Sequence, residues 1–505
     1  MRRSTTWLTA ALLTGLMLLS LPMVDLAVAL RGASPSVGGA LDTDAIDQIV
    51  ATHMRAGGIP GGQVAIVHGK QVVYLKGFGV AGPDGRAVTP QTPFILGSTS
   101  KAFTALAVMQ LVEAGRIDLD APATTYIPWL RARFAPSSAA ITVRHMLNHT
   151  SGFTYAQGMA GWDDTDTSDA ALTAAMRAYE SIQPARAPGA AYEYSNLNYL
   201  LLGQIVAAVA GQSYERYVQA HIFTPLEMRH AYTSAADAQS HGLATGYRYW
   251  FGRAYPDAGL PYPRRHLPDA FLIASAEDMA HHLIAQLNGG QYGGTRLISA
   301  DGIDAMQRAA VGTGAPGESY GMGWVSTEYG GEVTVVHGGD VPQFHSDVIL
   351  WPHEGWGVAV LINANTMIGD ARPQIVGLAP AIMAHIAGKP LLPPIPAKRT
   401  TYVSALAVLI VLSIMQIGRA AWWCVRRRTR TGTARGWRLA LALLADILLA
   451  ALLLVGVPWL QGMPLAAFQL FVPDIAWPAA GLAIISLVWA GFRTIFCIDR
   501  RTREG

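Results

Sequence analysis

Ser98 and Lys101 stand three positions apart at the start of an apolar stretch that runs to Gly115. Residues three apart share one face of a helix, so we expect the two side chains to meet. A lysine in apolar surroundings is costly, but when desolvated it can stay neutral and accept the proton of a serine. The pair is therefore a candidate for nucleophilic catalysis, although S-x-x-K alone is a common pattern.

Two further short motifs place polar groups beside apolar runs. Tyr194 and Asn196 follow a Pro-Gly turn and precede an apolar helix, where they offer a hydroxyl for a proton relay and an amide for reading a substrate. A helix cap at Ser195 or Asn196 explains the same pattern without chemistry. His337 and Gly339 follow an apolar strand, and a glycine there lets a substrate lie close to the strand edge.

Taken in this order, the three motifs resemble those of the serine β-lactamase and penicillin-binding-protein-like superfamily. The closest pattern is that of its class C-like branch, S-x-x-K, then Y-x-N, then K/H-x-G. The resemblance covers roughly residues 45–385 and includes flanking stretches such as TPFILGSTSKAFTA and YSNLNYLLLGQIVAAVAG. It implies a serine hydrolase that needs no cofactor and no metal.

The resemblance implies a catalytic role for three side chains and two backbone amides. Ser98 is expected to be the acylated nucleophile and Lys101 its proton acceptor. Tyr194 is expected to carry the proton to the leaving group and to help activate water. The backbone N–H groups of Ser98 and Asp340 are expected to form the oxyanion hole that such acyl transfers require.

The expected substrate-binding residues are Asn196, His337 and Gly339, and here the chain departs from the common pattern. Many relatives have a lysine where this chain has His337, so a cation is present only when that histidine is protonated. Asp340 follows Gly339 and places an acid beside the predicted pocket. We therefore expect a cationic substrate group to be favoured over an anionic one, and activity on β-lactams to be weak.

The remaining histidines of interest carry weaker signals. His266, in RRHLPDAF, either faces the substrate or lies at the surface in a proline-containing loop, and we expect the surface position. His149, His281 and His282 lack the spacing of a zinc motif, so we expect them to be structural or exposed.

The elements that must position these residues form an α+β domain over residues 42–388. Two apolar runs flank His68-Gly69-Lys70 and predict a β-hairpin, and strand-like stretches return near the end of the domain. Strands from both ends can pair into one antiparallel sheet flanked by helices. The middle predicts an all-helical insert, roughly Ala121–Ser234, and a proline-stiffened linker follows over residues 389–401.

Three apolar stretches after the linker are long enough to span a bilayer as helices, each approaching about 20 residues. They are Tyr402–Trp423, Trp437–Leu460 and Ile475–Phe496. They define a membrane domain over residues 402–496 and a tail over residues 497–505; a buried helical bundle is the alternative. Asp446 lies inside the second stretch, and we expect it to pair with a neighbouring helix.

Two independent signals predict the orientation. Residues 1–29 carry two arginines, an apolar run and the small residues Ala27-Val28-Ala29, which is typical of a secretory signal peptide or an N-terminal anchor. An arginine-rich loop separates the first two spans, whereas the loop between the last two contains no lysine or arginine. The positive-inside rule then predicts a bacterial cytoplasmic membrane protein with a cytoplasmic C-terminus and a periplasmic or extracellular catalytic domain.

The composition supports a polar domain followed by a membrane domain, and it argues against nucleic-acid-binding and disulfide-rich proteins. Of the 505 residues 51% are hydrophobic, which is too apolar for a fully soluble chain of this length. The net charge of +3 comes with arginines that cluster beside the apolar stretches, so no nucleic-acid partner is expected. The two cysteines, Cys424 and Cys497, lie at the ends of apolar stretches, so the domain before them has neither a disulfide framework nor a cysteine nucleophile.

The sequence thus predicts a membrane-anchored extracytoplasmic serine hydrolase with a small-molecule or peptide substrate. A peptidase or amidase acting on D-amino-acid-containing peptides and an esterase both fit. The architecture is similar to that of membrane-bound peptidases that activate prodrugs, such as the colibactin-maturing type. Three alternatives stay open: a penicillin-binding or ligand-sensing module that acylates without turnover, a β-lactamase, and an inactive relative.

Overall fold

The computed structural model describes residues 41–132, 140–329, 332–388, 399–429 and 436–504. These residues form two compact units that divide near residue 398. The predicted leader, residues 1–29, and most of the predicted linker lie outside the described residues.

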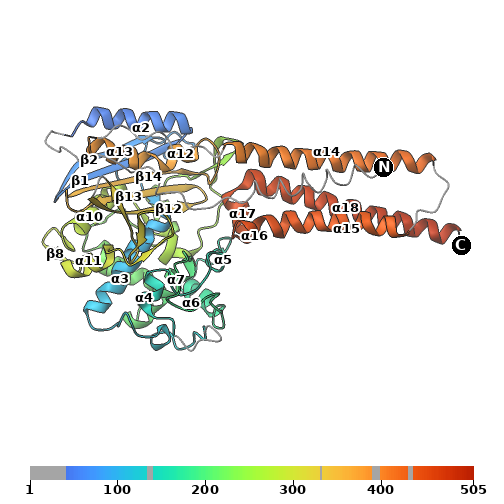
Figure 1. The fold of residues 1–505 in the computed structure, drawn as a ribbon. Coiled ribbons are helices and arrows are strands. Elements are labelled where there is room, and N and C mark those ends of the chain that lie inside the picture. Colours follow the sequence, from blue (N-terminus) through green and yellow to red (C-terminus); the bar gives the residue numbers. More distant parts are fainter. Residues whose placement is uncertain (1–40, 133–139, 330–331, 389–398, 430–435, 505) are drawn as a thin grey trace. The chain divides into compact units, whose positions relative to one another are not determined.

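An eight-stranded antiparallel sheet organises the first unit (Figure 1). Its strand order is β2-β1-β14-β13-β12-β11-β10-β9, so strands from both ends of the unit lie in one sheet, as predicted. The bounds are β1 Gly61–His68, β2 Gln71–Gly79, β9 Val311–Gly312, β10 Glu318–Tyr320, β11 Val325–Tyr329, β12 Glu332–Val341, β13 Phe344–Trp351 and β14 Trp356–Ile362.

The first and last parts of the sheet meet at β1 and β14. Val64 lies opposite Val360 in that antiparallel pair. β1 continues into β2 through a two-residue turn at Gly69 and Lys70, which confirms the predicted hairpin. Gly69 has φ of +58°, a left-handed conformation that glycine adopts without steric cost.

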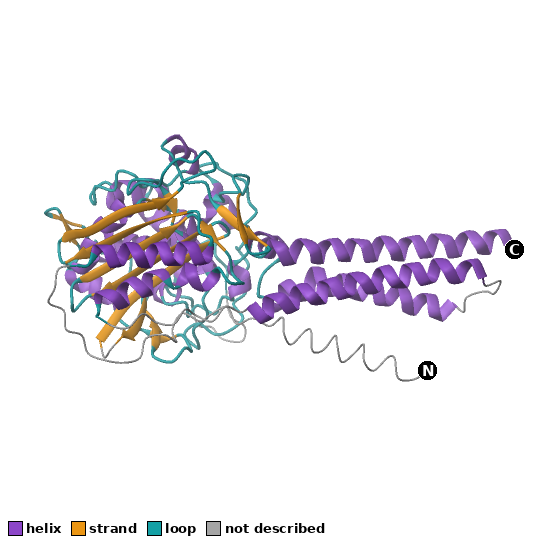
Figure 2. Cartoon of the chain, turned by 90° about the horizontal axis from the view of Figure 1, so that it is seen from above, coloured by secondary structure: helices purple, strands orange, loops and turns teal. Residues whose placement is uncertain are grey.

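Helices cover both faces of the sheet (Figures 1 and 2). One face packs against α2 (Thr43–Gly57), α12 (Arg372–Val376) and α13 (Leu378–Ile386). Alternate strand residues such as Val64 and Val358 enter this core, because successive side chains of a strand point to opposite faces. The opposite face packs against α10 (Ala276–Leu287), whose Leu283 and Leu287 lie next to Gly357.

The helix α3, Ser100–Glu113, is buried on nearly all sides. Its sequence is apolar all round and shows no polar stripe, which is the pattern of a helix enclosed by protein. A short 3-10 turn, η1, covers Gly97–Thr99 directly before it and lies against β12 and β13. The predicted Ser98 and Lys101 therefore sit where a loop from the sheet enters the core helix.

In the residues that the structure describes between β3 and β4, the regular elements are helices, apart from isolated bridges that join Pro122 to Thr142 and Tyr232 to Ile273. This confirms the predicted helical insert. Its α-helices are α4 Val143–Leu147, α5 Tyr155–Gly158, α6 Ala171–Arg177, α7 Asn196–Ala210, α8 Tyr214–Val218 and α9 Ala235–Ser240, and Gln219–Phe223 forms a π-helical turn. Two further turns, η4 (Arg264–His266) and η5 (Leu267–Phe271), lead back to the core.

Three small sheets and one more helix are also present in the first unit. The small sheets were not predicted from the sequence. The sheets are β15-β4-β5 (Ala364–Asn365, Tyr247–Trp250, Arg253–Pro256), β3-β6 (Phe94–Ile95, Ile273–Ala274) and β7-β8 (Gln291–Tyr292, Thr295–Arg296), and the helix is α11 (Ala300–Gln307).

The second unit consists of long apolar helices that run side by side. Among the described residues, three stretches are long and apolar enough to cross a membrane, at Tyr402–Trp423, Leu439–Leu460 and Pro473–Ile495, within two residues of the predicted bounds. The elements are α14 Arg399–Thr429, α15 Gly436–Ala451, the π-helical turn η6 Leu452–Gly456, α16 Val457–Leu460, α17 Leu465–Phe471 and α18 Pro473–Glu504. The helix α17 lies in the connection that the sequence predicted only as a loop.

Asp446 pairs with neighbouring helices, as predicted. It is fully buried and forms ion pairs with Arg493 of α18 and with Arg419 of α14, the latter at 3.1 Å. Gln416 of α14 lies 3.4 Å from the same carboxylate and donates to Ser486 of α18 at 2.6 Å. One polar cluster therefore links α14, α15 and α18.

Candidate active site

Ser98 lies in the turn η1, where the backbone passes unusually close to the sheet. Gly97 has φ of +58°, and a Cβ there would fall 2.5 Å from the carbonyl carbon of Gly339 in β12. A Cβ on Gly339 would in turn fall 2.1 Å from the carbonyl oxygen of Leu96. Glycine at both positions therefore allows the serine turn to pack directly on strand β12.

Two of the predicted side chains converge on the hydroxyl of Ser98. Lys101 Nζ lies 3.1 Å from Ser98 Oγ, and the hydroxyl of Tyr194 donates to Ser98 Oγ at 2.8 Å. Ser98 is partly exposed, whereas the side chain of Lys101 is fully buried beneath it. Ser98 is thus partly open to solvent, and its hydroxyl is contacted by an amine and a phenol.

The surroundings of these groups determine which can accept a proton. Burial lowers the pKa of Lys101 to about 8, and the opposing charge of Asp269 limits this decrease. Burial raises the pKa of Tyr194 well above its ordinary value. Near neutral pH a fraction of Lys101 is therefore unprotonated, while Tyr194 keeps its proton; this favours the lysine as the base and the tyrosine as a relay.

Asn196 is the first residue of α7, and Ser195 occupies the N-cap position without a side-chain capping bond. The amide oxygen of Asn196 accepts from Lys101 Nζ at 2.8 Å. The polar residues at this helix start are thus directed into the catalytic cluster, and a capping role does not explain them. Asn196 is buried and holds the lysine, and its contact with substrate stays a prediction.

The register of β12 explains why the amide of Asp340 is available. Val341 and Phe344 close a two-residue hairpin, so the next pair, Asp340 and His345, is one that exchanges no ladder hydrogen bonds. The N–H of Asp340 consequently points away from β13. β11 pairs with β12 only as far as Val336, so the free edge of β12 faces the turn of Ser98. The two predicted oxyanion-hole amides therefore lie on the same side of the site.

The carboxylate of Asp340 does not act as a free acid in the pocket. It receives bonds from Arg372 at 2.7 and 2.9 Å, from Asn365 at 3.0 Å and from His345 at 2.8 Å. His345 also lies 2.8 Å from Asp347, and the two carboxylates raise its pKa to about 9. The expectation that Asp340 favours a cationic substrate is therefore wrong, because the protein already supplies the positive partners.

His337 also differs from the expectation. It is buried, its Nε2 lies 3.2 Å from the hydroxyl of Tyr320, and burial together with the charge of Lys101 lowers its pKa to about 3. The ring is therefore neutral under ordinary conditions. It does not provide the titrating cation that the sequence suggested for binding a substrate carboxylate.

The prediction for His266 was wrong in both of its forms. Its side chain is fully buried, so it lies neither at the surface nor facing a substrate from solvent. Its Nδ1 lies 3.0 Å from Asp269 Oδ1, and its Nε2 lies 3.1 Å from the carbonyl oxygen of Ala160. A proline-containing loop suggested exposure, but the turns η4 and η5 fold this segment into the core.

The other histidines have structural positions. The ring of His149 is buried beside Tyr194, and its Nδ1 accepts from the backbone N–H of Ser195 at 3.1 Å. His282 is buried and stacks on Phe103, while His281 contacts the carbonyl oxygen of Leu226. Within the described ranges, no group of three or more His, Cys, Asp or Glu side chains is arranged to hold a metal ion.

Sequence reasoning missed several residues of the site. Tyr320 of β10 packs against His149 and contacts His337, and Asp269 supplies a carbonyl oxygen to Lys101 at 2.9 Å. Arg372 neutralises Asp340 from α12. Tyr320, Asp269 and Arg372 lie in none of the three motifs. The one local sign in the sequence was the charged Asp269 next to apolar neighbours, which is unusual for a residue without a role.

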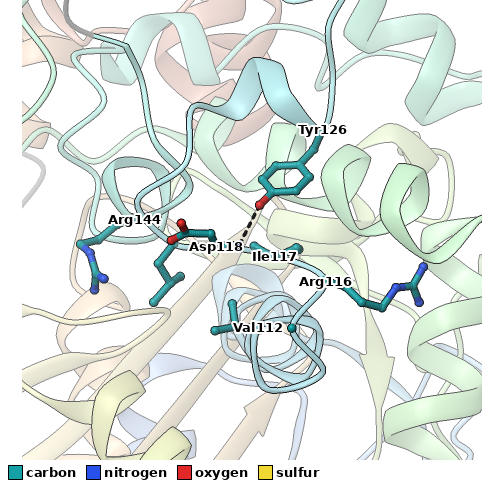
Figure 3. Close-up of a pocket in the computed structure, with 8 residues that line it drawn as sticks. Val112, Arg116, Ile117, Asp118, Tyr126 and Arg144 are labelled. Carbon is teal, nitrogen blue, oxygen red and sulfur yellow. Dashed lines mark hydrogen bonds between the residues drawn. The ribbon is translucent and has the colours of Figure 1, made fainter.

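A separate hollow lies at the other end of α3 (Figure 3). Arg116, Asp118, Tyr126 and Arg144 are among its lining residues, and the hydroxyl of Tyr126 accepts from the backbone N–H of Asp118 at 2.7 Å. A helix of this length places its ends about 20 Å apart. The hollow therefore does not belong to the Ser98 site.

The fold and the site together define a class of protein. An antiparallel sheet between helical layers, a helical insert, and a serine turn that leads into a buried lysine-bearing helix are the features of a β-lactamase-like domain. The chain belongs to the β-lactamase family: the family model described as Beta-lactamase matches residues 46–379. The resemblance seen in the sequence is thus confirmed.

The chain is also similar to individual proteins. Protein flp of Staphylococcus aureus is 29% identical over 325 residues, which is 64% of this chain and 63% of that protein. Unguisins hydrolase ungD' of Aspergillus campestris is 28% identical over 346 residues, 65% of this chain and 62% of that protein. The chain thus spans less than two thirds of the length of these relatives. Its family is one of hydrolases with the β-lactamase fold.

Two solved structures share the fold. The octameric penicillin-binding protein homologue from Pyrococcus abyssi has a TM-score of 0.61 and 29% identity, covering 70% of this chain and 80% of that one. EstCE1, a hydrolase with promiscuous acyltransferase activity, has a TM-score of 0.57 and 22% identity, covering 67% of this chain and 98% of that one. The second supports the fold alone.

Proposed function

We propose that this protein is a membrane-anchored serine hydrolase that works through an acyl-enzyme on Ser98. The substrate is a small molecule or peptide, cleaved as an amide by a peptidase acting on D-amino-acid-containing peptides or as an ester. The observation that carries the proposal is the convergence of Lys101 Nζ and the Tyr194 hydroxyl on Ser98 Oγ, at 3.1 and 2.8 Å.

The acylation step follows from the positions of these groups. Neutral Lys101 takes the proton of Ser98, and the serine oxygen forms a bond to the carbonyl carbon of the substrate. The carbonyl oxygen gains negative charge and is stabilised by the N–H groups of Ser98 and Asp340. The bond to the leaving nitrogen or oxygen then breaks, and the leaving group takes the proton through Tyr194.

Deacylation reverses these roles. Water takes the place of the leaving group and gives its proton through Tyr194 toward Lys101, and its oxygen bonds to the acyl carbon. The bond to Ser98 Oγ breaks, and the serine recovers its proton. The high pKa of Tyr194 suits a relay, because the phenol passes a proton without remaining ionised.

The charge state of the pocket supports a substrate other than a β-lactam. His337 is neutral and the carboxylate of Asp340 is paired, so neither residue offers a fixed charge to a substrate. A β-lactam presents a carboxylate, which gains nothing from this arrangement. The relative named unguisins hydrolase supports a hydrolytic activity outside the β-lactamases.

The proposed location is the extracytoplasmic side of a bacterial cytoplasmic membrane. Arginines are concentrated between the first two candidate spans and after the third. Positive loops stay in the cytoplasm, so the positive-inside rule supports a catalytic domain on the opposite side. The apolar start of the chain, with its small residues near Ala29, supports export.

Labelling of the detergent-solubilised protein with a fluorescent phosphonate, read by intact mass, tests the proposal. We expect wild type and Lys70→Ala, a change at an exposed turn lysine, to gain one adduct. Ser98→Ala and Lys101→Ala should gain none. Absence of labelling in folded wild type would contradict the proposal. If a screen of N-acyl-D-amino-acid amides and esters left a stable acyl adduct without turnover, the ligand-sensing alternative would replace it.

A further inference from the structure

Lys101 has a hydrogen-bond acceptor that belongs to none of the three motifs. The main-chain oxygen of Asp269 accepts from Lys101 Nζ at 2.9 Å. Asp269 is fully buried and lies in the π-helical turn η5, directly after a proline. The same turn contacts α3, since the carbonyl oxygen of Pro268 accepts from the hydroxyl of Thr104 at 2.6 Å. The position of the lysine therefore depends on how this turn is held.

His266 holds the turn from the other side. Its Nδ1 meets the carboxylate of Asp269 at 3.0 Å and its Nε2 meets the carbonyl oxygen of Ala160 at 3.1 Å, with both side chains fully buried. A carbonyl oxygen only accepts, so Nε2 carries a hydrogen. Nδ1 is the atom that meets the carboxylate of Asp269. The ring thus links the backbone at Ala160 to the side chain of Asp269 behind Lys101.

We infer that His266 and Asp269 are positioning residues for the proposed acyl transfer: they fix the carbonyl oxygen that holds Lys101 and set the charge beside its amine. The inference rests on the proposed function and assigns this pair a part in it. Neither residue touches Ser98 or the site of the reacting carbonyl, and both act through the lysine.

The other ionisable groups around the lysine do not supply this charge. Burial lowers the pKa of His149 and of His337 and raises the pKa of the neighbouring tyrosines, so these groups are uncharged near neutral pH. Arg265, the residue before His266, is directed to Tyr179 and Asp164 instead. The uncharged groups facing Lys101 or Asp269 are His149, His337, Tyr179, Tyr194, Tyr199 and Tyr214.

The first test replaces the charge and keeps the shape. The carboxylate of Asp269 favours the protonated lysine, so Asp269→Asn should move the midpoint of the pH–rate profile for phosphonate labelling down by about 1 pH unit. Labelling at pH 7 should then become roughly 2- to 5-fold faster than in wild type, after allowing for the weaker basicity of the lysine. Damage to the fold does not produce a gain of this kind.

The second test releases the turn. His266→Ala should lower the plateau rate at high pH by about 10-fold or more, because a misplaced base loses its alignment with the serine. His266→Gln keeps one donor and should restore part of the plateau. Asp278→Asn is the matched control: it changes another buried carboxylate, which caps α10 at Ser275, and should leave the midpoint unchanged.

The outcomes separate this inference from the proposed function. The inference is overturned if wild type is labelled but Asp269→Asn keeps the wild-type midpoint, or if His266→Ala keeps the full plateau rate. Either result leaves the proposed serine hydrolase function standing. A folded wild type that shows no labelling would remove both. A lower midpoint in Asp269→Asn together with a reduced plateau in His266→Ala would support the pair as positioning residues.

Discussion

The carboxylate of Asp340 forms a two-pronged ion pair with the guanidinium of Arg372, with oxygen–nitrogen distances of 2.7 and 2.9 Å. The backbone amide of the same residue faces the turn of Ser98. Asp340 thus joins the edge of β12 that faces Ser98 to α12, which packs on the face of the sheet that α2 and α13 also cover. The ion pair fixes the strand, while the amide remains free for chemistry.

Replacing Asp340 by Asn should destabilise the protein, because it leaves Arg372 largely buried without its counter-charge. Removing one partner of a buried pair is strongly destabilising, and partial exposure moderates the loss to about 2 kcal/mol or more. Thermal unfolding of the full-length protein in detergent measures the change. Arg229→Ala, which removes an exposed pair with Glu227 at 4.0 Å, is the control and should have little effect; equal losses in both variants would refute the role of the buried pair.

Lys101 should make acylation depend on pH. The amine accepts a proton only when it is unprotonated, so the labelling rate should rise with pH and level off above about 8, the pKa that burial produces. Arginine stays protonated in proteins, so Lys101→Arg should lower the rate by about 100-fold or more at every pH. Labelling for a fixed time, at steps of about one pH unit from about pH 5 to about pH 10, tests the pH dependence of wild type and the loss in Lys101→Arg. A rate that falls with rising pH would exclude the lysine as base.

Tyr194→Phe should separate the relay from the nucleophile. The ring remains in place, but the hydroxyl that donates to Ser98 at 2.8 Å is lost. We expect turnover of an ester to fall by about 100-fold or more, as for other positioned proton donors. Steady-state hydrolysis and intact mass measure turnover and trapped adduct. Tyr255→Phe, at an exposed strand residue, is the control. Turnover at the wild-type level would remove Tyr194 from the mechanism.

Gly339→Ala should impair the oxyanion hole without changing any reactive side chain. The new Cβ would fall 2.1 Å from the Leu96 carbonyl oxygen and 2.9 Å from the Ser98 nitrogen, so the serine turn must move away from β12. Loss of one oxyanion donor costs about 100- to 1,000-fold in rate. Gly312→Ala, whose Cβ would meet nothing closer than 4.0 Å, should label like wild type. Normal labelling of both would show that the close approach is not needed.

Hydrolysis of β-lactams should be weak at every pH. Burial holds the pKa of His337 near 3, so lowering the pH to about 5 does not create a cation for the substrate carboxylate. Nitrocefin hydrolysis at about pH 5 and about pH 7, which lie below and above the ordinary histidine pKa of about 6.5, measures this. Rates typical of dedicated β-lactamases, or a strong gain at the lower pH, would contradict the assignment of a neutral His337.

The sequence predicted Ser98, Lys101 and Tyr194 as one cluster because they lie in short motifs, and the structure brings these three side chains together. Ser98 and Lys101 are joined by one helical turn, and strand patterns at both ends of the domain predicted a shared sheet. The apolar spans were equally clear, since a run such as Tyr402–Trp423 has few other structural explanations. Such patterns depend only on residues that are close together in the chain, so the sequence alone reveals them.

The surroundings of the motif residues were not predictable in the same way. His337 and Asp340 looked like titrating charges, but their states depend on Tyr320 and Arg372, which lie 17 and 32 positions away and outside the motifs. His266 looked exposed, yet its neighbour Ala160 lies 106 positions away. Burial and long-range pairing decide the charge of such groups, and neither leaves a local pattern.

The polar cluster at Asp446 has a consequence for truncation of the chain. Its carboxylate is paired with Arg419 of α14 and with Arg493 of α18, so a chain that stops before α18 leaves the acid with only one of these two cationic partners. A buried acid that loses one of its partners is costly in an apolar environment. Shortening the chain by its last helix should therefore loosen the packing of the two helices that remain, because the polar cluster that joins all three is broken.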